Sequence, residues 1–200
     1  MAQSRTAELV TWLTAPPIVT ALTIAFIAFY APQGTGGLSN GAAFLLGLLL
    51  LVVAPVGELF LEARKGTMTW DLRTRGERTA FYGDWLKYSL LAALLFWLLG
   101  SPLMLALSFV FAETNALLWA LNKYYTKVSM HSSASTGLTS SVTLLLGWSW
   151  AWVYLLLIPV WWSRLELGAH DFKQIVLGSA CAWLACYFTY GYFFQVASIF

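Results

Sequence analysis

WLKYSLLAALLFWLLGSPLMLALSFVFAETNALLWAL, residues 85–121, is the stretch that decides the fold of this chain. It is almost wholly apolar, and it is too long for one membrane crossing, which takes about 20 residues. Its one strong break is Gly100-Ser101-Pro102, near the middle. Because Gly and Pro close together mark a turn, the stretch predicts two membrane helices joined as a tight hairpin.

The composition of the whole chain supports a membrane protein. Of its 200 residues, 60% are hydrophobic and only 10% are charged. A soluble domain carries about 25% charged residues, so most of this surface is expected to face lipid. The net charge is +2 and there is no basic run with interleaved aromatic residues, which excludes nucleic acid as a partner. We therefore expect one integral membrane domain over residues 1–200.

Four further apolar stretches flank the hairpin, and they lie at Val10–Tyr30, Ala42–Leu61, Thr136–Trp162 and Ile175–Phe194. The first contains Pro16 and Pro17, which predict an irregular first turn. The third contains Gly147 near its middle, which predicts a second hairpin, with one long tilted helix as the alternative. The chain is thus predicted to be all-α, a polytopic transmembrane bundle of seven spans, or of six in the alternative.

The positive charges are arranged on one side of the predicted spans. All eleven lysines and arginines fall in segments on the side that carries the N-terminus. The connections on the opposite side, at Pro32–Gly41, Gly100–Pro102 and around Gly147, carry no charge. Lys and Arg are enriched in cytoplasmic loops. The pattern therefore predicts a multi-pass protein of the cell membrane, with this charged side in the cytoplasm.

Three polar segments on that side hold groups suited to binding phosphate, and they lie at Asp71–Arg78, Lys127–His131 and Ser163–His170. Arginine binds phosphate oxygens in pairs, and a helix start offers backbone N–H groups to an anion. The last two segments contain the only histidines of the chain. An arginine-rich loop beside a membrane also binds anionic lipid headgroups and sets topology. Both histidines together with cations on one side favour phosphoryl chemistry instead.

Ser129-Met-His131 and Ser163-Arg164-Leu-Glu-Leu-Gly-Ala-His170 resemble the second and third motifs of the type 2 phosphatidic acid phosphatase superfamily. The second motif of that family is Ser-x-His near a helix start. The third is Ser-Arg, five residues and a His, with an Asp four residues later. Ser129 and His131 match the former, and Ser163, Arg164 and His170 match the latter with the same spacing.

The chain departs from the family pattern at several positions. In the first motif Arg78 matches the Arg, but Thr79 stands in place of Pro, and Asp71 precedes it where a Lys is expected. The charge of that Lys is left to one of three residues: Arg75, Arg73 or Lys127. In the third motif Gln174 stands in place of the Asp. A Gln there resembles the branch that includes dolichyl diphosphate phosphatases, and its amide oxygen is able to accept a hydrogen bond from the imidazole.

The resemblance implies a membrane lipid phosphatase that needs neither a metal nor another cofactor. His170 is implied as the nucleophile that forms a phosphohistidine, His131 as the acid and then the base, and Gln174 as the residue that orients His170. The phosphate ligands taken from the resemblance and from the cation pattern are Arg75, Arg78, Lys127, Ser129, Ser163 and Arg164. The residues agree with the absence of a metal, since the acids are scattered and Cys181 and Cys186 are about 140° apart on a helix.

The predicted substrate, and the only predicted partner, is a membrane lipid, and its class stays open. An isoprenyl or polyprenyl phosphate or diphosphate is favoured, with phosphatidic acid or phosphatidylglycerol phosphate as the alternative. A phosphotransferase of the same fold and an inactive family member are further alternatives. A transporter or anion-binding membrane protein is the alternative from another class, although Glu113 and Asn115 are the only notable polar residues within the spans. The sequence does not indicate an oligomeric state.

Overall fold

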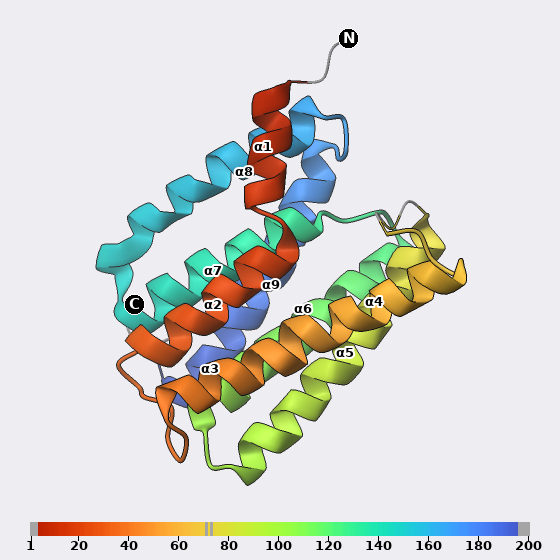
Figure 1. Ribbon diagram of the computed structural model, residues 1–200. Helices are drawn as coiled ribbons and strands as arrows, with labels where there is room; N and C mark the ends of the chain where they lie inside the picture. The colour runs from red at the N-terminus through yellow and green to blue at the C-terminus, as the bar shows by residue number, and fades with distance from the viewer. Residues whose placement is uncertain (1–3, 71, 73, 196–200) are drawn as a thin grey trace. The chain divides into compact units, whose positions relative to one another are not determined.

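The structure, a computed structural model, describes residues 4–70, 72 and 74–195 (Figure 1). Throughout these ranges it is helical and contains no strand, which confirms the predicted all-α class. The chain divides into two compact units, one formed by Met1–Phe26 and Lys127–Phe200 and the other by Ile27–Thr126. We call them the terminal unit and the central unit, and each is described by itself. The single membrane domain expected for residues 1–200 stays a prediction.

The helices of the central unit are α3 (Asn40–Leu48), the π-helical turn η1 (Leu49–Val53), α4 (Ala54–Lys65), α5 (Arg75–Leu98) and α6 (Pro102–Tyr124). Those of the terminal unit are α1 (Arg5–Leu13), α7 (Met130–Leu146), the 3-10 helix η2 (Trp148–Leu156), α8 (Leu157–Glu166) and α9 (Phe172–Phe194). Helix α2 (Pro16–Tyr30) begins in the terminal unit and ends in the central unit.

Three of the described helices are long and apolar enough to cross a membrane: Asn40–Lys65, which joins α3, η1 and α4, and the single helices α6 and α9. A fourth span results if α1 and α2 are counted together, since they follow one another with a bend of 43°. This bend lies at the proline pair where the sequence predicted an irregular turn. The chain therefore has three or four candidate spans by length and hydropathy, and these criteria do not confirm the predicted six or seven.

The hairpin predicted from residues 85–121 is confirmed in the central unit. Helix α5 ends at Leu98 and α6 begins at Pro102. Gly100 has φ +63°, in the left-handed region that side chains disfavour. Pro102 is in the first turn of α6, where its missing N–H costs no helical hydrogen bond. The Ser101 hydroxyl donates to the Thr35 carbonyl at 2.6 Å, which ties the turn to the segment between α2 and α3.

The second predicted hairpin also forms, in the terminal unit, and the alternative of one long tilted helix is wrong. Helix α7 ends at Leu146, and Gly147 follows with φ +104°. The chain then returns along α7 as η2 and α8. Gly147 allows this turn because a residue with a Cβ rarely adopts such a φ.

Helices α7 and α9 pack closely through small residues, and this pairing positions the candidate site. A Cβ on Gly178 of α9 would lie 2.5 Å from the carbonyl oxygen of Ser129, the N-cap of α7. Further along, a Cβ on Gly137 would lie 4.0 Å from the Cβ of Ala182. Small residues let helix backbones approach in this way. The contacts advance in the same direction on both helices, so α7 and α9 are parallel and begin at the same end of the terminal unit.

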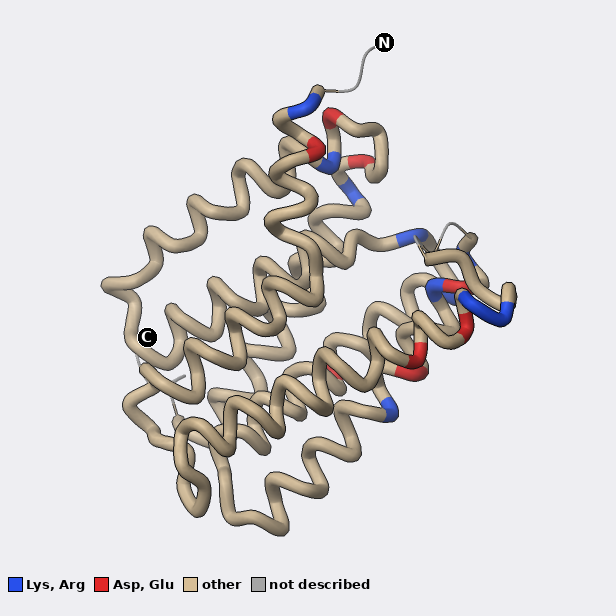
Figure 2. Tube along the Cα trace, viewed as in Figure 1, with Lys and Arg blue, Asp and Glu red and all other residues tan. Residues whose placement is uncertain are grey.

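Within each unit, the lysines and arginines gather toward one end of the helices (Figure 2). In the central unit, Arg64 and Lys65 lie in the last turn of α4, and Lys123 lies in the last turn of α6. In the terminal unit, Arg164 lies in the last turn of α8, and Lys173 lies at the start of α9. This grouping agrees with the one-sided charge pattern of the sequence, and the cytoplasmic orientation stays a prediction.

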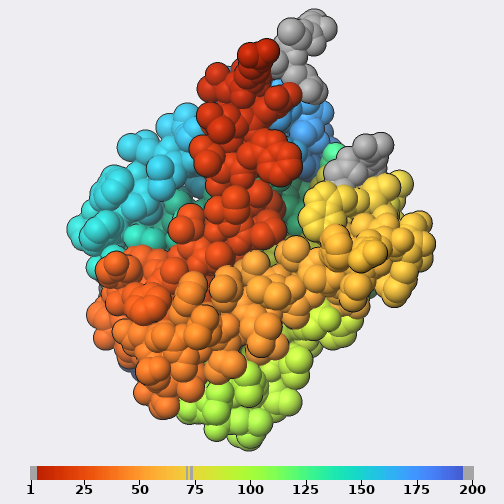
Figure 3. Space-filling model, viewed as in Figure 1, coloured from red at the N-terminus to blue at the C-terminus, as the bar shows by residue number. Residues whose placement is uncertain are grey.

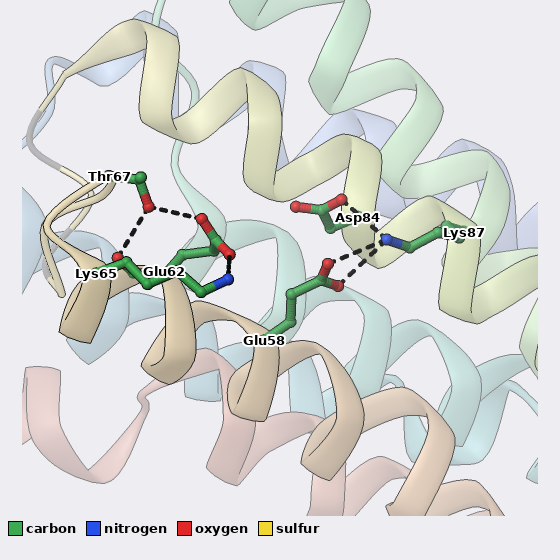
Figure 4. A network of polar contacts seen from close by, with 6 residues as sticks. All are labelled: Glu58, Glu62, Lys65, Thr67, Asp84 and Lys87. Carbon is green, nitrogen blue, oxygen red and sulfur yellow. Dashed lines mark hydrogen bonds and ion pairs between the residues drawn. The ribbon is translucent and has the colours of Figure 1, made fainter.

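Two lysines of the central unit are paired with acids on their own or a neighbouring helix (Figure 4). Lys65 Nζ lies 2.7 Å from the Glu62 carboxylate. Lys87 Nζ lies 3.2 Å from Glu58 and 3.1 Å from Asp84, and so joins α5 to α4. Exposed ion pairs of this kind add little to stability, because water and salt screen them. Both lysines are thus held within the central unit.

Candidate active site

His170 lies directly before α9, and its ring is held by a residue one turn into that helix. The Asp171 carboxylate caps α9 by accepting the N–H of Gln174 at 2.8 Å. This cap starts the helix one residue after Asp171, so that His170 Nδ1 and Gln174 Oε1 are 2.9 Å apart. A Gln side-chain oxygen only accepts, so Nδ1 is the donor in this contact, and a neutral ring would then carry its lone pair on Nε2. His170 is 6% exposed.

The five residues between Arg164 and His170 form a closed turn. The carbonyl of Arg164 accepts the N–H of Ala169 at 3.1 Å and the N–H of His170 at 3.3 Å. Gly168, with φ +59°, lets the chain reverse between them. The spacing of the third motif therefore has a local cause. It brings the backbone at the C-terminal end of α8 next to the histidine that precedes α9.

Ser129 and His131 lie at the start of α7, beside the start of α9. Ser129 is fully buried and caps α7, since its hydroxyl accepts from the backbone N–H of Ser132 at 3.3 Å. Its own N–H donates to the backbone carbonyl of Gln174 at 3.2 Å. Gln174 thus holds His170 with its side chain and Ser129 with its main chain. His131, in the first turn of α7, is half-buried.

Two cations belong to the same group of residues. Lys127 Nζ donates to the carbonyl of Ala169, next to His170, at 3.1 Å. Arg164 is 9% exposed, and its Nη1 donates to the hydroxyl of Thr11 at 3.2 Å. The N-termini of α7 and α9 add the positive ends of two helix dipoles at the same end of the unit. Together these groups place positive charge around the imidazole of His170.

Ser163 is buried next to Arg164, but its hydroxyl forms a hydrogen bond within its own helix, α8. It is 0% exposed and donates to the carbonyl of Val160 at 2.8 Å. Ser129 likewise serves as a helix cap. A phosphate contact from either hydroxyl, as the sequence predicted, stays a prediction.

Arg75 and Arg78 lie on α5 and belong to the central unit. Arg75 Nε donates to the carbonyl of Asn122 on α6, and the amide of Asn122 donates back to the carbonyl of Arg75 at 2.9 Å. Arg78 Nε donates to the carbonyl of Leu72 at 2.9 Å. Both side chains therefore bind backbone within their own unit, and their role as phosphate ligands stays a prediction. Asp71 and Arg73 lie outside the described residues.

Two residues of this region were missed by the sequence reasoning. Gly178 is one turn after Gln174, and its spacing of four with Ala182 and Cys186 is the signal that identifies it, since small residues at that interval pack helices in membranes. Thr11 has no comparable signal, because the chain segment that contains it is far from the third motif.

Cys181 and Cys186 are both buried. Among the described residues, no group of three or more His, Cys, Asp or Glu side chains is placed to hold a metal ion.

Comparisons of this chain with protein-family models, with curated proteins and with solved structures found no match.

Proposed function

We propose that this chain is a membrane-embedded lipid phosphate phosphatase that works through a phosphohistidine at His170. The observation that carries the proposal is the double role of Gln174. Its side chain orients His170 at 2.9 Å and its carbonyl holds Ser129 at 3.2 Å, so that two separate motifs converge on one residue. Arg164, Lys127 and two helix N-termini in the same unit supply charge suited to an anion.

The reaction would proceed in two steps. His170 Nε2 forms a bond to the terminal phosphorus of the substrate while the bond from that phosphorus to the oxygen of the lipid alcohol, or of the lipid monophosphate in a diphosphate, breaks. His131 gives its proton to that leaving oxygen. Water then attacks the phosphohistidine, His131 takes a proton from the water, and the nitrogen–phosphorus bond breaks to release phosphate. Arg164, Lys127 and the backbone at the start of α7 would offset the negative charge on the phosphoryl oxygens.

The proposed topology places this site at a membrane surface. We infer seven spans, by adding α5, α7 and the arm formed by η2 and α8 to the four candidates above. The arm consists of nine residues in 3-10 and ten in α conformation. At rises of about 2.0 and 1.5 Å per residue, it extends about 33 Å, enough for a hydrocarbon core of about 30 Å. The site then faces the cytoplasm by the charge rule.

The proposed substrate is an isoprenyl or polyprenyl phosphate or diphosphate, whose tail would stay among the helices while its phosphate enters the site. Phosphatidic acid and phosphatidylglycerol phosphate are the second choice. The test is release of inorganic phosphate by the purified full chain in detergent micelles with EDTA present, from farnesyl, geranylgeranyl and longer polyprenyl diphosphates and from the two glycerolipids. We expect release from at least one of them.

The same assay separates the remaining alternatives. A phosphotransferase would transfer the phosphoryl group to an added alcohol and would release little inorganic phosphate. A transporter would move its substrate across liposomes without releasing phosphate. Failure on every lipid, with flux in liposomes, would show that the phosphatase proposal is wrong.

Replacing Gln174 with Glu is expected to shift the pH dependence of the reaction. A carboxylate in place of the amide favours the imidazolium form, so it raises the pKa of His170. The nucleophile must be neutral, and it would therefore be protonated up to a higher pH than in the parent. We expect the acidic limb of the kcat/KM profile to move upward by about one pH unit.

The control for this variant is Gln174→Leu, which removes the hydrogen bond without adding a charge. It should lower kcat over the whole pH range and leave the position of the acidic limb unchanged. A profile of Gln174→Glu identical to that of the parent would show that Gln174 does not act on the nucleophile.

A further inference from the structure

The N-terminal helix brings a side chain to the arginine of the third motif. The hydroxyl of Thr11, in α1, accepts from Arg164 Nη1 at 3.2 Å and donates to the Ser163 hydroxyl at 3.5 Å. Ala7 lies one turn earlier on the same helix face and is 0% exposed, so this face of α1 is packed against the unit. Figure 3 shows α1, in red, on the surface of the molecule. Helix α1 thus connects with α8 through the Ser-Arg pair.

The chemistry of this contact suits an arginine that must bind an anion. Arg164 is 9% exposed, so its guanidinium has little freedom to be oriented by water. A threonine hydroxyl accepts one of its N–H groups and carries no charge. An acid at this place would form an ion pair with Arg164 and offset the charge that a phosphate needs. Thr11 therefore orients the guanidinium and leaves its positive charge in place.

We propose that Thr11 is a positioning residue that holds Arg164 for the phosphoryl group of the substrate. The proposal rests on the proposed function, because it gives Arg164 a phosphate to bind. It also predicts that Thr11 does not contribute to the choice between lipid substrates. Thr11 acts through a ligand of the phosphoryl group, which all lipid phosphates share. Its loss should therefore weaken the reaction of prenyl and glycerol lipids by the same factor.

The experiment measures binding of inorganic phosphate to the full chain in detergent, by calorimetry, together with kcat and KM for the lipids that the parent hydrolyses. Thr11→Val removes the hydroxyl at nearly constant shape, Thr11→Ser keeps it, and Thr11→Asp replaces it with a charge. Thr14→Val is the matched control. Thr14 follows α1 directly, and its hydroxyl donates to the Val10 carbonyl at 2.7 Å, within its own helix.

We expect Thr11→Val to weaken phosphate binding about tenfold, as for the loss of a hydrogen bond to a charged group. Thr11→Ser should restore binding, and Thr14→Val should bind phosphate as the parent does. Thr11→Asp should bind phosphate more weakly than Thr11→Val, although it retains a hydrogen-bond acceptor. A residue that only supports folding would not give this order. Thermal unfolding followed by tryptophan fluorescence checks that each variant is folded.

Two results would overturn the inference. One is phosphate binding by Thr11→Val equal to that of the parent, and the other is binding by Thr11→Asp as strong as that by Thr11→Val. If the parent chain hydrolyses lipid phosphate, either result overturns only the role proposed for Thr11, and the proposed function is unaffected. A parent chain that neither binds phosphate nor hydrolyses any lipid overturns both proposals.

Discussion

Replacing His170 with alanine is expected to stop phosphate release from every lipid that the parent hydrolyses. In the proposed mechanism the imidazole supplies the atom that bonds to phosphorus. Removal of a catalytic nucleophile lowers kcat by at least about 10³-fold. The hydrogen bond to Gln174 is lost with the ring, but Asp171 still caps α9, so the helix itself should form.

The measurement has three parts. The first is release of phosphate by His170→Ala and by the control Lys173→Ala, an exposed residue near the start of the same helix. The second is trapping of acid-labile, alkali-stable phosphate on the parent after rapid quenching with labelled substrate. The third is addition of free imidazole, which should restore part of the activity of His170→Ala. Retention of full activity by His170→Ala would rule out the phosphohistidine.

Replacing Gly178 with alanine is expected to separate the two motifs. The added Cβ would lie 2.5 Å from the carbonyl oxygen of Ser129, which is backbone and cannot rotate away. The start of α7 must then move from α9, and the hydrogen bond from Ser129 to Gln174 lengthens. Overpacking of this kind costs about 1–3 kcal/mol of stability. The loss in kcat/KM should exceed the loss that reduced stability alone would cause, because Gln174 also orients His170.

Gly137→Ala provides the matched control for this prediction. It adds the same methyl group to the same pair of helices, but its Cβ would lie 4.0 Å from Ala182, an ordinary van der Waals distance. Both variants are assayed for phosphate release and for thermal unfolding. We expect kcat/KM to fall more than tenfold in Gly178→Ala and to stay near the parent value in Gly137→Ala. Equal behaviour of the two variants would show that the close approach at Gly178 does not hold the site.

The features predicted well from the sequence are those with a local cause. The turns at Gly100 and Gly147 follow from the residues at those positions, and the first breaks an apolar stretch too long for one membrane crossing. The number of spans was harder to predict. Helix α5 begins with a charged segment and α7 has only 17 residues, so neither meets the length and hydropathy expected of a span.

Only part of the candidate site was predicted from the sequence, and that part also has a local cause. Gln174 lies four residues after His170, and one helical turn brings side chains at that spacing together. In contrast, Arg75 was assigned to phosphate because arginine binds phosphate. In the folded chain its Nε donates to the carbonyl of Asn122, a residue on a different helix. Such a competing backbone partner has no signature in the sequence near Arg75.

The sequence by itself determined that the chain is helical, that it has helices apolar enough for a membrane and that the positive charges of each unit gather toward one end, because these depend on composition, periodicity and turn residues. It also determined which side chains meet within one helical turn. The contacts between Gly178 and Ser129 and between Thr11 and Arg164 were decided only by the tertiary structure. They depend on how close two helix backbones approach and on which face each helix turns inward, and both are set by packing over the whole unit.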